Sequence, residues 1–302
     1  MPPGMTTLRL SNQPRALGKS GIMVSPLAWG MWRLAGDDVA AVRALIDAAL
    51  EAGITLFDTA DIYGFDTAAG FGSAEALFGR ALAEDGTLRD RMVIATKGGI
   101  LPPMPYDSSR AYLTAALDDS LRRMQVETVD LYQVHRRDLL THPHEVAGAL
   151  DAMVASGKVR SVGVSNHSPA EFDALQAFLG QPIVATQPEF SALHTVPLFD
   201  GTLDQAMARD VAVLAWSPLG GGRLARGDHP AAALLAKHGA AFGVDAGTAA
   251  LAWVMAHPAR VIPIVGSQNA VRIAAAAGAY RVEWTREQWY AVLQAGMGAT
   301  LP

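Results

Sequence analysis

Short apolar runs alternate with longer amphipathic segments along almost the whole chain. Each run is apolar at consecutive positions, which is typical of a strand that is buried on both faces of a parallel sheet. The longer segments carry helical patterns. The runs predict eight strands, at residues 23–30, 54–60, 92–97, 129–135, 159–166, 183–190, 211–218 and 260–267. The segments predict eight helices, at residues 37–53, 73–84, 109–125, 142–157, 168–180, 203–210, 244–258 and 269–279.

Eight strand–helix units in about 250 residues fit a closed (β/α)₈ TIM barrel better than an open sheet. Residues 8–21 predict a small β-hairpin that plugs the barrel floor, and residues 285–299 predict an extra C-terminal helix. Ser168, followed by a proline, reads as a helix N-cap. No linker or change of composition divides the chain, so we expect a single barrel domain over residues 1–302.

Two glycine-containing segments lead into predicted helices, at residues 217–245 and 70–79. The widest gap between predicted units runs from Ser217 to Asp245 and begins "SPLGGGRLARGDHP". A loop of that length inside a compact domain is usually functional. The segment "GFGSAEALFG", residues 70–79, contains a G-x-G before a helix but lacks the third glycine and does not directly follow a strand. It therefore predicts a helix-opening turn and not a pyrophosphate loop.

Composition narrows the functional class. The formal charge of −5 at pH 7 comes without a basic stripe, so we expect no nucleic-acid partner. The chain has no cysteine, which excludes disulfides, thiolate chemistry and a Cys-based zinc site. No signal peptide or apolar stretch of roughly 20 residues is present, so we expect a cytoplasmic protein without a membrane partner. His142 and His144 are interpreted as solvated loop residues, and no metal site is predicted. The oligomeric state is unknown, with a monomer slightly favoured.

Polar residues stand where predicted strands end, and the chemistry of such a barrel lies at the C-terminal ends of its strands. Asp58 ends the second strand with Tyr63 just beyond it, Lys97 ends the third, and His135 ends the fourth. A lysine near a tyrosine stabilises the phenolate and lowers the tyrosine pKa from about 10, which improves general acid catalysis. The aspartate would balance the lysine, and the histidine would orient a carbonyl oxygen or help move the proton. Taken singly, each of these residues would more often be a solvated residue at the rim of the barrel. An aspartate beside a lysine would more often be only a structural ion pair. Together they indicate a catalytic relay.

These segments resemble the aldo-keto reductase family over essentially the whole chain. "FDTADIYG", "IATKGG" and "VDLYQVH" match the family's catalytic segments, which implies catalytic roles for Asp58, Tyr63, Lys97 and His135. "LGKSGIMVSPLAWGMWR" is similar to the family's opening hairpin and first strand. "AWSPLGGGRL" and "QAGMGATLP" are most similar to a group of bacterial predicted oxidoreductases. The resemblance implies hydride transfer from a reduced nicotinamide to an aldehyde or ketone, with Tyr63 as general acid.

The resemblance also implies a cofactor site. In "GKVRSVGVSNHSPAEF" and "LAWSPLGGG" it implies that Ser165, Asn166 and Gln187 hold the nicotinamide carboxamide, that Trp216 stacks on the nicotinamide, and that Ser217 and Leu219 hold the pyrophosphate. The full set of residues expected at the cofactor is Gly30, Trp32, Ser165, Asn166, Gln187, Trp216, Ser217, Leu219, Arg223, Gly266, Ser267, Gln268 and Arg272. Trp32 is also expected to bound the substrate site, whereas Trp29 is expected in the core.

The choice between NADPH and NADH depends on the ribose 2′-phosphate. Ser267 and Arg272 match the family's phosphate-binding serine and arginine, which implies NADPH. Gly266 stands where many members carry lysine, and two alanines (Ala275 and Ala276) replace the acid–amide pair that commonly contacts the adenine. We therefore expect looser adenine recognition. Arg272 as an ordinary helix-surface residue and Arg223 facing solvent remain open alternatives.

The principal alternative function is a regulatory subunit that binds the cofactor and senses redox state with little turnover. A metal-dependent barrel hydrolase would need clustered ligands on several strand ends, and His135 with Asp58 is too few for that. The expected partner is a small carbonyl compound, an aromatic or small aldehyde or ketone. Residues 64–72 are expected to form one wall of a relatively open pocket.

Overall fold

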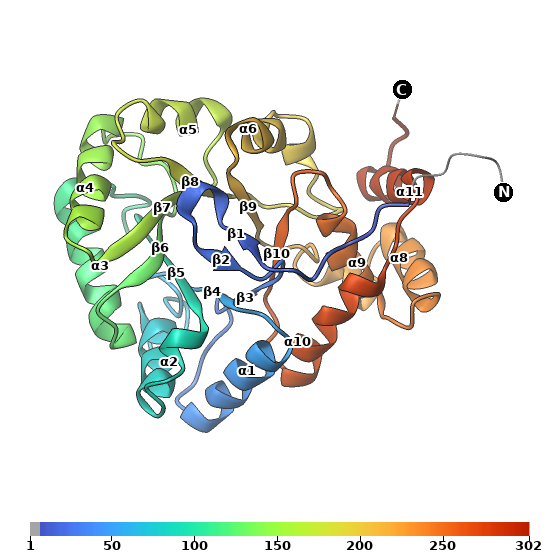
Figure 1. Ribbon diagram of the computed structural model, residues 1–302, viewed down its shortest axis with the longest axis horizontal. Helices are drawn as coiled ribbons and strands as arrows, with labels where there is room; N and C mark the ends of the chain where they lie inside the picture. Colours follow the sequence, from blue (N-terminus) through green and yellow to red (C-terminus); the bar gives the residue numbers. More distant parts are fainter. Residues whose placement is uncertain (1–6, 302) are drawn as a thin grey trace.

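The protein is described by a computed structural model that covers residues 7–301, and its centre is a closed barrel of eight parallel strands (Figure 1). The barrel closes where the last strand pairs with the first, through Ile264 beside Ala28. The strands are β3 (Ala28–Gly30), β4 (Leu56–Asp58), β5 (Val93–Gly98), β6 (Val129–Val134), β7 (Val159–Ser165), β8 (Ile183–Gln187), β9 (Ala212–Ala215) and β10 (Ile262–Val265). The expected (β/α)₈ barrel is confirmed.

Helices form the outer ring around these strands (Figure 1). They bury their apolar faces against the strands, because a parallel sheet of this kind needs cover on its outer surface. The expected cap at Ser168 is present as a complete capping box with Glu171. The ring contains α1 (Val39–Glu51), α2 (Ser73–Ala83), α3 (Arg110–Met124), α4 (Pro143–Ala155), α5 (Pro169–Gln176), α6 (Thr202–Arg209), α9 (Ala246–Met255) and α10 (Ala270–Ala276), with α11 (Arg286–Met297) added at the C-terminal end.

The predicted first strand, residues 23–30, is two elements. β1 (Arg15–Ala16) pairs antiparallel with β2 (Met23–Val24) in a hairpin, and only β3 belongs to the barrel. Pro26 separates the two elements, because proline has no N–H to continue a ladder. The hairpin lies across one end of the barrel (Figure 1), where its fully buried Leu17 and Val24 pack on the apolar side chains of the interior.

A glycine makes this close approach possible. Gly18 lies in the hairpin with a φ of +52°, and a Cβ there would clash with the Val184 carbonyl oxygen at the start of β8. Any larger residue would lift the hairpin from the strands. The expected plug at the N-terminal end of the barrel is thus observed, and the C-terminal ends of the strands stay free for polar side chains.

The expectation of one long loop between Ser217 and Asp245 was wrong in part. This segment contains α7 (Arg223–Arg226) and α8 (Pro230–Ala240). α8 begins after His229, whose ring accepts the Ala231 N–H, and it packs against α9 and α11. The alanine-rich sequence of α8 gives little apolar–polar contrast, which is why the pattern did not reveal it. Among residues 7–301 no helix is both long enough and apolar enough to cross a membrane.

Candidate active site

The expected catalytic residues converge on the buried ammonium group of Lys97. Its Nζ donates to Asp58 Oδ2 at 2.7 Å, to the Thr59 carbonyl at 2.8 Å and to the Tyr63 hydroxyl at 3.1 Å. A lysine ammonium has three protons, so this geometry uses all of them. Lys97 has no exposed surface and Asp58 is only 2% exposed. The lysine therefore cannot be a solvated rim residue.

The turn after β4 brings the tyrosine back over β5. The Thr59 N–H donates to Ala95 O at 2.9 Å and the Asp61 N–H to Lys97 O at 3.0 Å, so the β4–β5 pairing continues beyond the last strand residue. A tighter turn follows, in which the Tyr63 N–H donates to Ala60 O at 3.1 Å. The spacing of five positions between the acid and the phenol is thus set by this turn.

The pKa values differ in part from the sequence argument. Burial raises the pKa of Tyr63, Lys97 lowers it, Asp58 raises it again, and the net direction is upward. The expectation that Lys97 would bring the pKa below its ordinary value is therefore wrong for this state of the protein, because burial outweighs the ammonium. Burial alone would lower the pKa of Lys97, but Asp58 and Tyr63 raise it overall. At neutral pH the phenol keeps its proton and the lysine its charge.

Two rings flank the tyrosine. His135 contacts the Tyr63 ring edge-on, with 6.0 Å between centroids, and Trp32 does so with 5.1 Å. Burial, with Lys97 and Arg136, holds the pKa of His135 well below its usual range, so the imidazole is neutral. Trp32 is 54% exposed, which suits a residue at the entrance of a site, whereas Trp29 is fully buried as expected.

Asn166 links three strand ends beside this cluster. Its Oδ1 accepts the Trp216 indole N–H at 2.9 Å, and its Nδ2 donates to Ser165 Oγ at 2.8 Å and to the His135 carbonyl at 3.3 Å. Its backbone has a φ of +55°. The expected nicotinamide residues on β7 and after β9 therefore lie in one network with His135.

Gln187 belongs to both groups of residues. Its Nε2 donates to Asp58 Oδ1 at 2.9 Å, so it holds the aspartate from the side opposite Lys97. Its Oε1 makes no hydrogen bond among the described residues. The sequence indicated Gln187 only as a cofactor residue, and the contact with Asp58 was missed because it joins strands separated by more than a hundred positions.

The remaining expected cofactor residues lie after β9 and β10. Ser217, with a φ of +53°, accepts the Gly221 N–H on its Oγ at 2.9 Å, and half-buried Leu219 follows it. Arg223 begins α7 and is exposed.

After β10, Gln268 Nε2 donates to Gly30 O at 3.1 Å, and Ser267 O accepts the Trp29 indole at 3.0 Å. Gly266 lies beside the Arg33 guanidinium, and Arg272 is exposed on α10. Arg223 and Arg272 form no ion pair within residues 7–301, so both are available to an anion.

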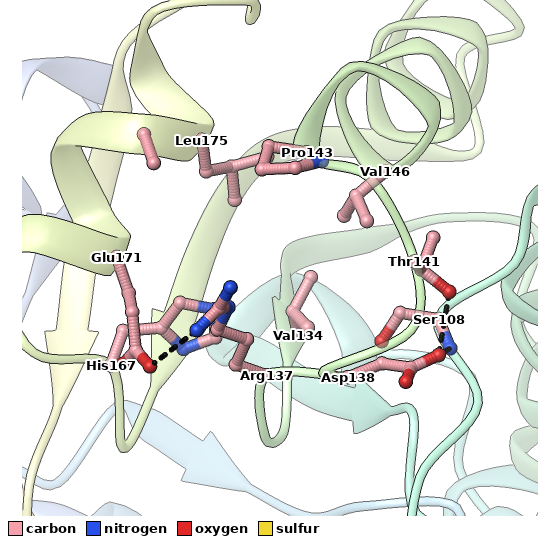
Figure 2. Close-up of a pocket in the computed structure, with 11 residues that line it drawn as sticks. Ser108, Val134, Arg137, Asp138, Thr141, Pro143, Val146, His167, Glu171 and Leu175 are labelled. Carbon is pink, nitrogen blue, oxygen red and sulfur yellow. Dashed lines mark hydrogen bonds and ion pairs between the residues drawn. The ribbon is translucent and has the colours of Figure 1, made fainter.

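A separate small cavity of about 30 Å³ lies between α4 and α5, next to the segment that follows β7 (Figure 2). Its lining includes Ser108, Asp138 and His167 but none of the four residues expected to be catalytic. A wider groove of about 650 Å³ lies near the start of β6, beside Arg89 and Asp130, away from the polar strand ends. The described residues contain no group of three or more His, Cys, Asp or Glu side chains that would hold a metal ion.

Comparison with known proteins agrees with the barrel fold. A model of the aldo/keto reductase family matches residues 26–295. The 6-dehydroglucose reductase of Novosphingobium aromaticivorans is 54% identical over 99% of this chain and 100% of its own length. A 6-dehydroglucose reductase of Agrobacterium fabrum is 40% identical over 91% of this chain and 95% of its own. The crystal structure of the thermostable aldo-keto reductase Tm1743 with the inhibitor epalrestat superimposes with a TM-score of 0.82, at 24% identity, over 94% of this chain and 99% of that one. That structure is similar in fold.

Proposed function

The chain belongs to the aldo/keto reductase family, and from that premise we propose that it reduces an aldehyde or ketone to an alcohol with NADPH. The observation that carries the proposal is the buried Asp58–Lys97–Tyr63 cluster, in which a neutral phenol is hydrogen-bonded to a charged ammonium at 3.1 Å. A structural ion pair needs no phenol, so the presence of Tyr63 supports a catalytic role for the cluster. NADPH would supply the hydride.

The side chains provide the matching proton. The carbonyl oxygen of the substrate would accept hydrogen bonds from the Tyr63 hydroxyl and from the neutral His135 ring, which directs it toward the proton donor. As negative charge develops on that oxygen, Tyr63 gives up its proton, and Lys97 stabilises the phenolate that remains. Asp58 balances the charge of Lys97 in a buried site, and Gln187 holds Asp58 in place.

The residues present fit a nicotinamide cofactor. Gln187 Oε1 offers an acceptor to a carboxamide N–H. The Ser165 hydroxyl and the Asn166 amide donate to protein oxygens, and one of these bonds, of which Asn166 to the His135 carbonyl at 3.3 Å is the longest, would be exchanged for a bond to the carboxamide oxygen. Trp216 is held by Asn166 beside them. Arg272, without an ion-pair partner in the described chain, would bind the 2′-phosphate with Ser267 and favour NADPH over NADH. Ser217, Leu219 and Arg223 would lie along the pyrophosphate.

We further propose a sugar aldehyde of the 6-dehydroglucose type as the substrate. The support is the name of two relatives that match this chain nearly end to end, at 54% and 40% identity. This choice is narrower than the small or aromatic carbonyl compounds expected from the sequence.

The test is NADPH oxidation, followed by absorbance, with 6-dehydroglucose, glucose and benzaldehyde as substrates. We expect turnover that is at least tenfold more efficient with 6-dehydroglucose than with benzaldehyde, and none with glucose. Equal use of both aldehydes would reject the sugar substrate and keep the reductase. Tight NADPH binding with no turnover of any substrate would favour a regulatory cofactor-binding subunit instead.

A further inference from the structure

His167 closes the segment that carries Ser165 and Asn166. Its Nδ1 lies 2.9 Å from the carbonyl oxygen of Ser165, two residues earlier in the chain. A carbonyl oxygen can only accept, so Nδ1 is the nitrogen that carries the proton. Burial lowers the pKa of His167, which makes the neutral ring the form present at neutral pH. The side chain is 9% exposed, so water does not compete freely for this bond.

The residue between them needs such support. Asn166 has a φ of +55°, in the left-handed region that residues other than glycine adopt at an energetic cost, which is smaller for asparagine than for most. Its N–H donates to Gln187 O at 3.1 Å, which fixes one side of the turn. The bond from His167 to Ser165 O fixes the other side, because it spans the strained residue.

A shift of Asn166 would be transmitted to several neighbours. Its amide holds Trp216, Ser165 and the His135 carbonyl within 3.3 Å. These are the residues that the proposed function places at the nicotinamide end of the cofactor. The pyrophosphate and 2′-phosphate ends depend on other segments, after β9 and β10.

We propose that His167 is a positioning residue that holds Ser165 and Asn166 in the geometry required to bind the nicotinamide ring. The proposal rests on the proposed function, since it assigns the nicotinamide to this segment. His167 lines the small cavity between α4 and α5, and its assigned role acts through the Ser165 carbonyl.

The surroundings of the ring allow the hydrogen bond to be tested apart from its bulk. Figure 2 shows His167 at one side of the small cavity, next to Arg137, whose guanidinium pairs with Glu171 at 3.2 Å. The cavity of about 30 Å³ leaves room for the slightly larger ring of phenylalanine. Asparagine places its side-chain N–H₂ as many bonds from Cα as Nδ1 of histidine. His167→Phe therefore keeps the ring without the donor, and His167→Asn keeps the donor without the ring.

The experiment measures dissociation constants of NADPH and of 2′-phospho-ADP-ribose, which lacks the nicotinamide, for the wild type and both variants. We expect His167→Phe to weaken NADPH binding about fivefold, the loss of one net hydrogen bond, with 2′-phospho-ADP-ribose unchanged. His167→Asn should restore NADPH binding to within about twofold of wild type. Thermal unfolding of each variant shows that it is folded at the assay temperature.

Other outcomes separate the two proposals. Equal weakening of both ligands in His167→Phe, or no weakening of either, would overturn the positioning role, as would a His167→Asn variant no better than His167→Phe. A wild-type protein that binds neither ligand would overturn the proposed function, and the inference with it. Wild-type binding of 2′-phospho-ADP-ribose as tight as NADPH would place the nicotinamide away from this segment and overturn the inference alone.

Discussion

Two buried aspartates stand three residues apart in the segment "FDTAD", and their surroundings differ in charge balance. Asp58 has a carboxylate oxygen on Lys97 at 2.7 Å and the other on Gln187 at 2.9 Å. Asp61 accepts from the Tyr112 hydroxyl at 3.1 Å on one oxygen, and the other oxygen has no partner among the described residues. Both are almost fully buried, with 2% and 0% exposure, so burial does not distinguish them.

The difference lies in the number of cations available. Asp58 has Lys97, one charge for one charge. Asp61 shares its region with Glu75, which is also buried, and the single arginine there, Arg123, pairs with Glu75 at 2.7 Å. Burial first, and then the charge of Glu75, raise the pKa of Asp61 to about 8. Asp58 therefore has a cation of its own to balance, whereas the raised pKa of Asp61 favours the protonated form at neutral pH.

The largest expected effect is from Lys97→Met. The change leaves Asp58 as an uncompensated buried charge, which costs about 3–5 kcal/mol of stability, and it removes the group that stabilises the phenolate. We expect reductase turnover to fall by about 10³-fold or more, measured by NADPH oxidation alongside denaturant unfolding. The matched control is Asp58→Asn/Lys97→Met, which should recover most of the stability and none of the activity. Stability that stays low in the double variant would show that the loss did not arise from the unpaired aspartate.

The second prediction concerns pH and Asp61→Asn. The carboxyl has a pKa of about 8 in the folded protein against an ordinary value of 3.8, so between these values unfolding releases a proton. Wild-type stability should therefore fall as pH rises through this window, by about 1.4 kcal/mol per pH unit from this group. Asp61→Asn removes the contribution, and its stability relative to wild type should increase from pH 5 to pH 8. Urea unfolding at several pH values measures the difference, and parallel curves for the two proteins would contradict the assigned protonation.

The smallest expected effect is from Thr96→Val, an isosteric change next to Lys97. Thr96 Oγ1 donates to Glu75 Oε1 at 2.5 Å. It therefore belongs to the cluster of Asp61, Glu75 and Arg123 and not to the Asp58–Lys97–Tyr63 cluster. Loss of this bond should cost about 1–3 kcal/mol in unfolding free energy, because its acceptor is charged and buried. Turnover at saturating substrate should stay within about twofold of wild type. A large loss of turnover would show that the two clusters are coupled, and that their separation into catalytic and structural groups is wrong.

The sequence was sufficient for the barrel because every strand is apolar on both faces and a helical segment separates each from the next. It was insufficient where local pattern is weak. The first strand was predicted too long because Pro26 lies inside one apolar run. Helix α8 was missed because its alanines give little contrast between apolar and polar positions. The four residues predicted to be catalytic were chosen from their positions at or just beyond strand ends, and the structure brings them together. The contact of Gln187 with Asp58 and the hydrogen bond of His167 were not predicted, since neither leaves a pattern along the chain.

The direction of the Tyr63 pKa shows a further limit. The sequence places a lysine nearby, and the ammonium does act to lower the pKa, but only the structure shows that the phenol is 8% exposed and that burial prevails. The raised pKa means that Tyr63 would enter the proposed reaction protonated. Its acidity must then increase as negative charge develops on the substrate oxygen.

The most direct test of the central claim, that Tyr63 is the general acid, is Tyr63→Phe assayed for turnover of 6-dehydroglucose and for NADPH binding. The change removes one oxygen and keeps the ring against Trp32 and His135. The account predicts a loss of turnover of about 10²–10⁴-fold, the usual contribution of a positioned acid, with the NADPH dissociation constant within about twofold of wild type. Turnover within tenfold of wild type would contradict it.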